Sequence, residues 1–344
     1  MSADGASTPT RRINLALQGG GAHGAFTWGV LDRLLEDPRI EIEGICGTSA
    51  GAMNAVALAH GMAEGGAAGA RQTLDAFWLG VAEAGRFSPV RRSPIDRLLG
   101  TWRLDHSPSY VIFDYVTRML SPYQTNPHNY NPLEQVLEEV VDFDVVRRCT
   151  AIKLFICATN VRTGKIKVFG REEVCREAIL ASACLPFLFQ AVEYDGEHYW
   201  DGGYMGNPAI FPLIYRCEAP DVMIVQINPL YREAIPDTAR EIMDRVNEIS
   251  FNSSLMREMR AIAFVGRLIE EGKLDRRHYK RMNIHLLEAD EQLKPLGVSS
   301  KLNAELAFLE HLKAIGREAC ERWLARNFDQ IGVSSTVDLV ETYL

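Results

Sequence analysis

The sequence predicts an α/β fold in which a mainly parallel central sheet is sandwiched between layers of helices. Apolar runs of strand length alternate with helical patterns from residue 13 to about residue 227. Residues 222–227 form a largely apolar run, which is typical of a buried parallel strand. Two glycine-rich turns, at residues 19–24 and 47–51, each separate a strand-like run from a helix-like run. This repeated strand–turn–helix order favours a three-layer α/β/α arrangement.

The chain has 344 residues, which is enough to bury a large core. Residues 1–12 are mostly small and polar, and we expect a disordered tail there. The alternation of strands and helices occupies residues 13–230, which we interpret as the main domain. Residues 231–344 carry two long apolar stripes at helical spacing, so we expect a mostly helical extension that packs on the core.

The first glycine-rich turn follows a strand-like run at residues 13–17. Backbone N–H groups at the start of a helix attract negative charge, so this turn is a candidate anion-binding loop. Its spacing also fits the dinucleotide-binding fingerprint, with Glu41 and Glu43 about 20 residues further on. A ribose-binding acid is expected at the end of a strand, whereas this run continues through Cys46. A nucleotide site therefore stays as one alternative, and a plain tight turn as another.

The second turn has the pattern Gly-x-Ser-x-Gly, with Ser49 between Gly47 and Gly51. A serine at a sharp turn between a strand and a helix stands clear of the backbone, and flanking glycines remove Cβ atoms that would crowd the turn. Residues 42–46 supply the strand, and helical patterns follow at residues 52–61 and 67–81. This context indicates a nucleophile elbow with Ser49 as the candidate nucleophile. A chance match in a loop is the simpler alternative.

Residues 85–132 differ in character from the rest of the chain. They hold six of the fifteen prolines, several arginines and many aromatic residues, among them Trp102 and Phe113. Such a long irregular insertion is typical of a lid or binding loop, and exposed aromatics beside arginines suit contact with lipid. A well-packed surface excursion is an equally good interpretation. The alternating pattern then resumes, with a helix expected at residues 131–140 and strands at residues 152–160 and 166–169.

A serine nucleophile needs a base, which in many hydrolases is a histidine. Three of the histidines that follow Ser49 lie at a plausible distance along the chain, but they stand in a basic run, inside a strand pattern and on a helical pattern: His278, His285 and His311. Asp201 differs, because the hairpin pattern at residues 192–201 delivers it into a turn formed by Gly202 and Gly203. An ordinary Asp-Gly turn is the alternative interpretation of this site.

Taken in order, the two glycine-rich turns and the Asp-Gly-Gly turn resemble the three motifs of the patatin-like phospholipase family. Segments at residues 157–160 and 181–186 resemble the family as well, and the resemblance covers roughly residues 13–230. It implies a catalytic domain with a Ser–Asp dyad and no catalytic histidine, in which Ser49 is the nucleophile and Asp201 the base. The first turn would form the oxyanion hole, with Gly19, Gly20, Gly21, Ala22 and Gly24.

One position departs from the family pattern. His23 stands where many relatives carry Arg or Lys, so the cation expected near the oxyanion is missing at this position. The dyad also raises a chemical question, because an aspartate of ordinary pKa is a poor base for a serine hydroxyl. Burial raises the pKa of a carboxyl group, so we expect Asp201 to be enclosed by protein.

Charge and cysteine usage narrow the function further. The net charge is −8, which argues against a general nucleic-acid binder. The seven cysteines show no metal-ligand spacing and are typical of a reduced, cytosolic protein. No apolar stretch approaches the length of a membrane-spanning helix. We expect no metal, because no oxygen-rich calcium loop is present, and the dyad chemistry requires no cofactor.

The sequence thus predicts a cytoplasmic serine acyl hydrolase that cleaves lipid or other hydrophobic carboxylic esters through an acyl-enzyme intermediate. Peripheral contact with a lipid surface is compatible with this prediction. One alternative is a nucleotide-dependent oxidoreductase that uses the loop at residues 19–24, and another is a non-catalytic lipid-binding member of the same fold. The acyl chain, the head group and the oligomeric state are left open.

Overall fold

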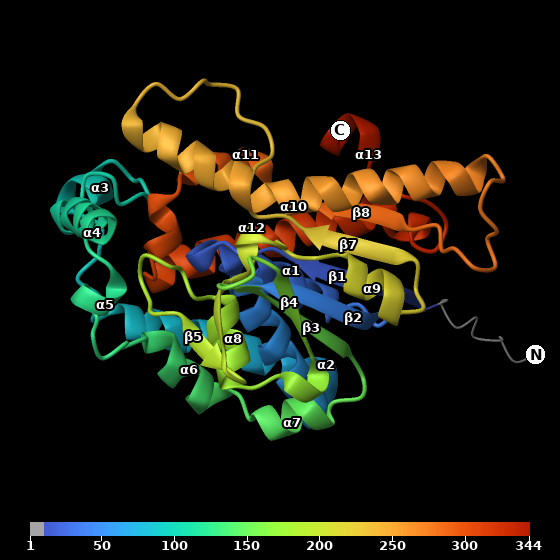
Figure 1. Ribbon diagram of the computed structural model, residues 1–344, viewed down its shortest axis with the longest axis horizontal. Helices are drawn as coiled ribbons and strands as arrows, with labels where there is room; N and C mark the ends of the chain where they lie inside the picture. Colours follow the sequence, from blue (N-terminus) through green and yellow to red (C-terminus); the bar gives the residue numbers. More distant parts are fainter. Residues whose placement is uncertain (1–9) are drawn as a thin grey trace, which may run out of the picture.

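The computed structural model describes residues 10–344, and within them one eight-stranded sheet forms the centre of the molecule (Figure 1). The strand order is β5-β6-β3-β2-β1-β7-β8, and β4 pairs with β3. The strands are β1 (Arg11–Leu17), β2 (Ile40–Thr48), β3 (Lys153–Asn160), β4 (Ile166–Gly170), β5 (Val192–Tyr194), β6 (Glu197–Asp201), β7 (Asp221–Val225) and β8 (Asn283–Leu287).

Five of these strands are parallel to one another: β1, β2, β3, β7 and β8. The remaining strands β4, β5 and β6 pair antiparallel at the other edge of the sheet. The predicted mainly parallel sheet is therefore confirmed. The first strand begins at Arg11, two residues before the run expected from the sequence, while residues 1–9 of the expected tail lie outside the described residues.

Helices cover both faces of the sheet, as the sequence predicts. One face packs against α1 (Gly24–Leu34), α2 (Ala50–Gly85), α6 (Pro132–Val140), α7 (Phe143–Arg148), α8 (Arg176–Ser182) and α12 (Leu306–Asn327). The opposite face packs against α9 (Phe211–Arg216), α10 (Ala239–Glu270) and α13 (Leu339–Tyr343). Side chains of β1 alternate between the two layers, because successive residues of a strand point to opposite faces.

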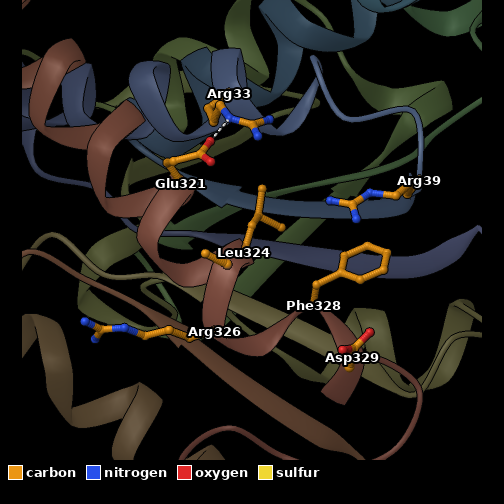
Figure 2. Close-up of a pocket in the computed structure, with 8 residues that line it drawn as sticks. Arg33, Arg39, Glu321, Leu324, Arg326, Phe328 and Asp329 are labelled. Carbon is orange, nitrogen blue, oxygen red and sulfur yellow. Dashed lines mark hydrogen bonds and ion pairs between the residues drawn. The ribbon is translucent and has the colours of Figure 1, made fainter.

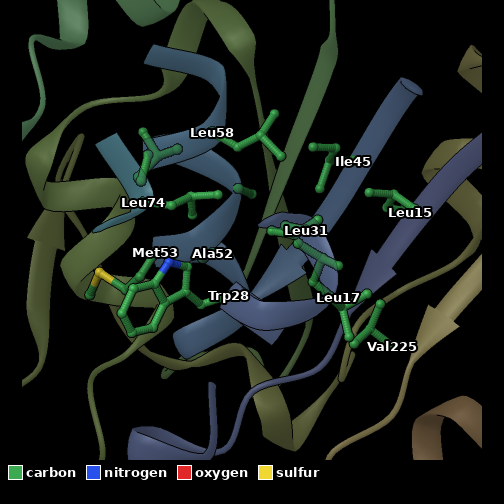
Figure 3. Packing of buried hydrophobic residues seen from close by; sticks show 14 of the residues in the cluster. Leu15, Leu17, Trp28, Leu31, Ile45, Ala52, Met53, Leu58, Leu74 and Val225 are labelled. Atoms are coloured by element: carbon green, nitrogen blue, oxygen red, sulfur yellow. The ribbon is translucent and has the colours of Figure 1, made fainter. Parts of the chain in front are cut away.

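The larger core layer lies between β1, α1 and α2 (Figure 3). Leu17 from β1, Leu31 from α1 and Leu58 from α2 are fully buried there, and Trp28 is nearly so. Each such side chain stabilises the fold by roughly 1.5–3 kcal/mol through removal of apolar surface from water. This layer fixes the carboxyl ends of β1 and β2, from which the two glycine-rich turns emerge.

Helix α2 contains both helices that the sequence predicts in this region. Its helical geometry is interrupted at Gly65 and Gly66, where Gly66 has a φ of 62°. A glycine adopts this left-handed conformation without steric cost, so the chain turns and a second helical segment follows. A Cβ at Gly61 would overlap the backbone at Gly69, which shows how closely the two segments approach each other.

The segment at residues 85–132 is more helical than expected. It contains α3 (Pro94–Leu98), α4 (Pro108–Met119) and α5 (Pro122–Thr125), each preceded by a serine and begun by a proline. A serine at the N-cap and a proline in the first turn are strong helix starts, so these prolines begin helices rather than interrupt them. Trp102 is also not a free aromatic: its ring stacks on Phe308 at 5.2 Å and on His311 at 5.6 Å.

The C-terminal part of the chain is built into the main sheet. Strand β8 pairs in parallel with β7, and α12 packs against α1. The α1–α12 contact is close, because a Cβ at Gly29 would overlap the carbonyl of Lys313 and one at Gly316 would overlap that of Phe26. Short elements join β8 to α12: α11 (Asp290–Leu293), η4 (Lys294–Leu296) and η5 (Ser299–Leu302). They bring residues near 300 against the first glycine-rich turn.

Candidate active site

Ser49 lies at a sharp turn between β2 and α2, as the sequence predicts. Its φ of 54° and ψ of −121° are unusual for a residue with a side chain. A Cβ at Gly47 would lie 2.6 Å from the carbonyl oxygen of Gly51, and a Cβ at Gly51 would overlap that of Leu17. Both glycines are therefore required for the turn to pack against the end of β1. The geometry is that of a strained nucleophile elbow.

Neighbouring side chains hold the elbow in place. The amide of Ser49 donates to Oγ of Ser182 at 2.9 Å, and this hydroxyl donates to the carbonyl of Cys157 at 2.6 Å. The hydroxyl of Thr48 donates to the carbonyl of Gly206 at 2.6 Å. Because Ser182 bridges β3 and the turn, its role depends on packing between distant segments, and the resemblance of residues 181–186 to the family does not by itself indicate that role.

Asp201 ends β6 and is 0% exposed, in agreement with the expected enclosure. Its amide donates to the carbonyl of Cys184 at 2.8 Å, and its carbonyl accepts from the hydroxyl of Thr159 at 2.8 Å. The amide of Gly203 donates to Oδ1 of Asp201 at 2.7 Å. A Cβ at Gly202 would overlap the carbonyl of Cys157, and a Cβ at Gly203 would overlap the ring of Phe251.

Burial raises the pKa of Asp201 to about 6, against smaller opposing effects of the Gly203 amide, the Ser49 hydroxyl and the charge of Lys301. The Ser49–Asp201 contact is looser than a well-formed hydrogen bond, because Oδ2 of Asp201 has no such partner among residues 10–344. Ser49 itself is only 9% exposed. The two sequence-predicted residues are thus both buried, and Oδ2 of Asp201 has no hydrogen-bond partner among the described residues.

The first glycine-rich turn lies directly against the elbow. A Cβ at Gly19 would be 2.7 Å from Cβ of Ser49. The amide of Gly19 donates to Oδ1 of Asn207 at 2.7 Å, and that of Gly24 donates within the turn to the carbonyls of residues 21 and 22. Gly20, Gly21 and Ala22 stand at the start of η1 (Gly21–His23), where the first amides of a helix have no acceptor within it. Of the five expected positions, these three therefore have amides without an acceptor inside η1.

His23 is buried and does not carry the missing charge. Its Nε2 lies 2.7 Å from Oγ of Ser300, and burial lowers its pKa to about 3, with a further lowering by the charges of Lys301 and Arg232. The ring is therefore neutral at ordinary pH.

The other candidate histidines are engaged elsewhere. Nε2 of His285 lies 2.8 Å from Asp221 inside the sheet, Nδ1 of His278 lies 3.2 Å from Asp275 at the surface, and His311 stacks on Trp102. No hydrogen bond joins any of the three to Ser49 or Asp201 within the described part of the chain.

The geometry also removes support for a dinucleotide site. Glu43 accepts from the amides of Glu218 and Ala219 at 2.7 and 2.8 Å and from Lys153 at 2.9 Å, so both of its oxygens are occupied. Glu41 pairs with Arg12 at the surface. Among the described residues, no group of three or more His, Cys, Asp or Glu side chains is placed to hold a metal ion.

A pocket near the surface lies away from this site (Figure 2). It is lined by side chains of both charges, among them Arg39, Arg326 and Asp329. Arg39 precedes β2, whereas Ser49 follows it, so the pocket lies at the opposite end of that strand. Its charged lining does not suit an apolar substrate.

The family profile described as patatin-like phospholipase matches residues 15–214, which is more than half of the chain and includes Ser49 and Asp201. The chain belongs to the patatin-like phospholipase family. The prediction of the family from the ordered motifs is confirmed, and the family match supports lipid hydrolysis at the level of the family.

Solved structures give distant likenesses to this patatin-like chain. VipD from Legionella pneumophila is 14% identical with a TM-score of 0.41, and the match covers 92% of this chain and 67% of VipD. ExoU in complex with SpcU from the type III secretion system of Pseudomonas aeruginosa is 14% identical with a TM-score of 0.32, covering 92% of this chain and 53% of that one. This patatin-like chain thus spans about half the length of that ExoU chain. Comparison with curated protein sequences gives no match.

Proposed function

We propose that this protein is a serine acyl hydrolase that cleaves lipid or other hydrophobic carboxylic esters through Ser49 and Asp201. The observation that supports this most strongly is the pairing of a strained, glycine-flanked serine with a fully buried aspartate whose pKa is raised to about 6. A carboxylate with a pKa near the working pH can both accept and return a proton. At pH 7 it is mostly ionised and ready to accept one.

In the proposed reaction, Oγ of Ser49 attacks the acyl carbonyl carbon while its proton passes to Asp201. The carbonyl oxygen becomes an oxyanion, which the free amides of Gly20, Gly21 and Ala22 stabilise, typically by ~3–4 kcal/mol per donor. The bond to the alcohol then breaks, and the alcohol leaves with the proton from Asp201. Water next attacks the acyl-enzyme and loses a proton to Asp201. The bond between the acyl carbon and Oγ then breaks, Oγ takes the proton back from Asp201, and the fatty acid is released.

Access to the site supports an apolar substrate. Ser49 and Asp201 are almost completely covered, so substrate entry requires movement of neighbouring segments. Helices α3 and α4, together with the residue that follows α3, expose a large set of apolar side chains, which is typical of an interaction surface: Ile95, Leu98, Leu99, Val111, Ile112, Tyr115 and Met119. We propose that this α3–α4 surface contacts the lipid phase and controls the entry of bulky esters.

None of the described helices has both the length and the apolar character needed to cross a membrane. Contact with lipid would therefore be made by surface residues such as those of α3 and α4.

A panel of esters with increasing acyl-chain length tests the proposed activity. Wild-type protein should hydrolyse the panel and Ser49→Ala should not, while both unfold at the same temperature. The same samples should be titrated with NAD, because micromolar nucleotide binding without any ester hydrolysis would favour the oxidoreductase alternative. Absence of both activities would favour a non-catalytic lipid-binding protein.

A further inference from the structure

Lys301 lies outside the matched family region, yet it packs against the proposed oxyanion loop. It belongs to η5, in the C-terminal part of the chain. A Cβ at Gly21 would lie 2.5 Å from the carbonyl oxygen of Lys301. The φ of Gly21 is +57°, so this close approach and the left-handed conformation both require glycine. The backbone of η5 therefore forms the wall behind the loop.

The side chain of Lys301 reaches the same loop through one intermediary. Its Nζ donates to Oδ1 of Asn228 at 2.7 Å. Nδ2 of Asn228 then donates to the carbonyl of Gly19 at 2.8 Å. The backbone amide of Asn228 donates to Oε1 of Gln18 at 3.0 Å. A charged donor polarises and strengthens the hydrogen bonds beyond it. Lys301 thus helps to fix the backbone from which the free amides project.

The charge of Lys301 is not neutralised by a close partner. No carboxylate lies within 4.0 Å of its Nζ in the part of the chain that the structure describes. Burial lowers the pKa of Lys301, and the charged groups that face it are Glu248 and Asp244 on α10, Arg232, and Asp201. Arg232 is itself paired with Glu248 at 2.6 Å.

Lys301 also has a small electrostatic effect on Asp201. The charge of Lys301 lowers the pKa of Asp201, whereas the thiol of Cys184 and the hydroxyl of Tyr204 face the same carboxyl as neutral groups. His23, inside the loop, is neutral. Among the described residues, Lys301 is therefore a buried amine that packs against the proposed oxyanion loop without a carboxylate in salt-bridge contact.

We propose that Lys301 is a positioning residue for the hydrolysis, which holds the oxyanion loop through Asn228 and favours negative charge at the site. The inference rests on the proposed function. It also means that residues 231–344 complete the site rather than merely cover the sheet. A fragment limited to the matched region would lack this charge.

The test compares Lys301→Met with Lys301→Arg and with the control Lys294→Met. Lys294 lies in the adjoining η4 and pairs with Asp290 at 2.8 Å, so its loss removes a nearby lysine that does not touch the loop. With a short soluble ester, Lys301→Met should lower kcat by about tenfold to hundredfold with KM nearly unchanged, because the displaced amides act on the transition state. Lys301→Arg should restore much of kcat, and Lys294→Met should match wild type.

The pH profile separates a positioning role from a merely structural one. Removal of the positive charge should raise the pKa of Asp201, so the acid limb of kcat/KM in Lys301→Met should move to higher pH, while Lys301→Arg keeps the wild-type limb. If Lys301→Met fails to fold, Lys301→Gln is used in its place. If Lys301→Met is active with unchanged kcat and an unchanged acid limb of kcat/KM, the inference about Lys301 is overturned while the proposed function stands. A wild type without turnover would instead overturn the proposed function.

Discussion

The amide of Gly203 donates a 2.7 Å hydrogen bond to Oδ1 of Asp201, two residues earlier in the chain. The turn after β6 therefore fixes the orientation of its own carboxylate. Because Oδ1 is held in this way, Oδ2 is the oxygen left for exchange of a proton. The Asp-Gly-Gly sequence thus supplies the carboxylate, its orientation and the space around it in three consecutive residues.

Asp201→Asn should reduce ester hydrolysis by about 10²–10⁴-fold, because an amide cannot accept the serine proton. The turn should survive, since the amide oxygen of Asn can still accept from Gly203. Steady-state kinetics on a soluble ester measure the loss. Asp195→Asn is the control, because Asp195 occupies the exposed turn of the same hairpin and should leave the rate unchanged. Comparable loss in both variants would point to damage to the hairpin instead.

The same substitution should stabilise the protein above pH 6. The pKa of Asp201 is raised from 3.8 in the unfolded chain to about 6 in the folded state. Between these two pH values the folded protein keeps a proton on Asp201 that the unfolded chain has already lost. The contribution of this group to stability is therefore present at low pH and is lost as the pH rises through about 6. Asn carries no charge and avoids the loss, which amounts to about 3 kcal/mol at most.

Thermal unfolding of wild type and Asp201→Asn at several pH values measures this difference. Glu258 and Glu288 also have raised pKa values and contribute to the pH dependence of both proteins, so the quantity of interest is the difference between the two curves. That difference should be small at pH 4 and should grow in favour of the variant toward pH 8. A constant difference would mean that the carboxyl is not destabilised by burial.

Gly21→Ala should lower kcat while KM changes little, because the amides of the loop act on the oxyanion of the transition state. The added methyl group would meet the backbone of Lys301, so the loop must shift. Gly164→Ala is a matched control: Gly164 has a φ of +65° with open space around it, so it tests the backbone strain alone. A rise in KM at constant kcat would indicate a ground-state binding role for the loop.

Polar substitutions on the α3–α4 surface should weaken action on aggregated long-chain esters more than on a short soluble ester. Leu98 and Ile112 are 87% and 64% exposed, so Leu98→Gln with Ile112→Gln should leave the fold intact. Val333→Gln is the control, since Val333 is 65% exposed elsewhere on the surface. Trp102→Ala is unsuitable for this test, because the ring is packed against Phe308. Equal loss on both substrates would contradict an access role.

The sequence revealed the parts of the site that are local in the chain. Ser49 and Asp201 each stand in a short glycine-containing motif, and the geometry of such a turn depends on residues a few positions apart. Ser182, Asn207 and Lys301 carry no comparable local pattern. They reach the site through pairings between segments more than 100 residues apart, so only the folded structure reveals them.

The same distinction applies to the segment at residues 85–132, for which the sequence left a lid and a well-packed surface excursion open. The sequence predicts an irregular insertion there, yet Pro94 and Pro108 follow capping serines and begin helices. The packing of Trp102 depends on Phe308 and His311, which lie far from it in the sequence. The family and the mainly parallel sheet, in contrast, follow from the order of motifs and from the alternation of strands and helices.

The most direct test of the account is covalent labelling with a fluorophosphonate followed by mass spectrometry of the labelled peptide. A fluorophosphonate reacts with a serine that is activated as a nucleophile and held beside an oxyanion hole. We predict labelling of wild type at Ser49 alone, slow labelling of Asp201→Asn and none of Ser49→Ala. Labelling at another serine, or full labelling of Ser49→Ala, would contradict the assignment of Ser49 as the nucleophile.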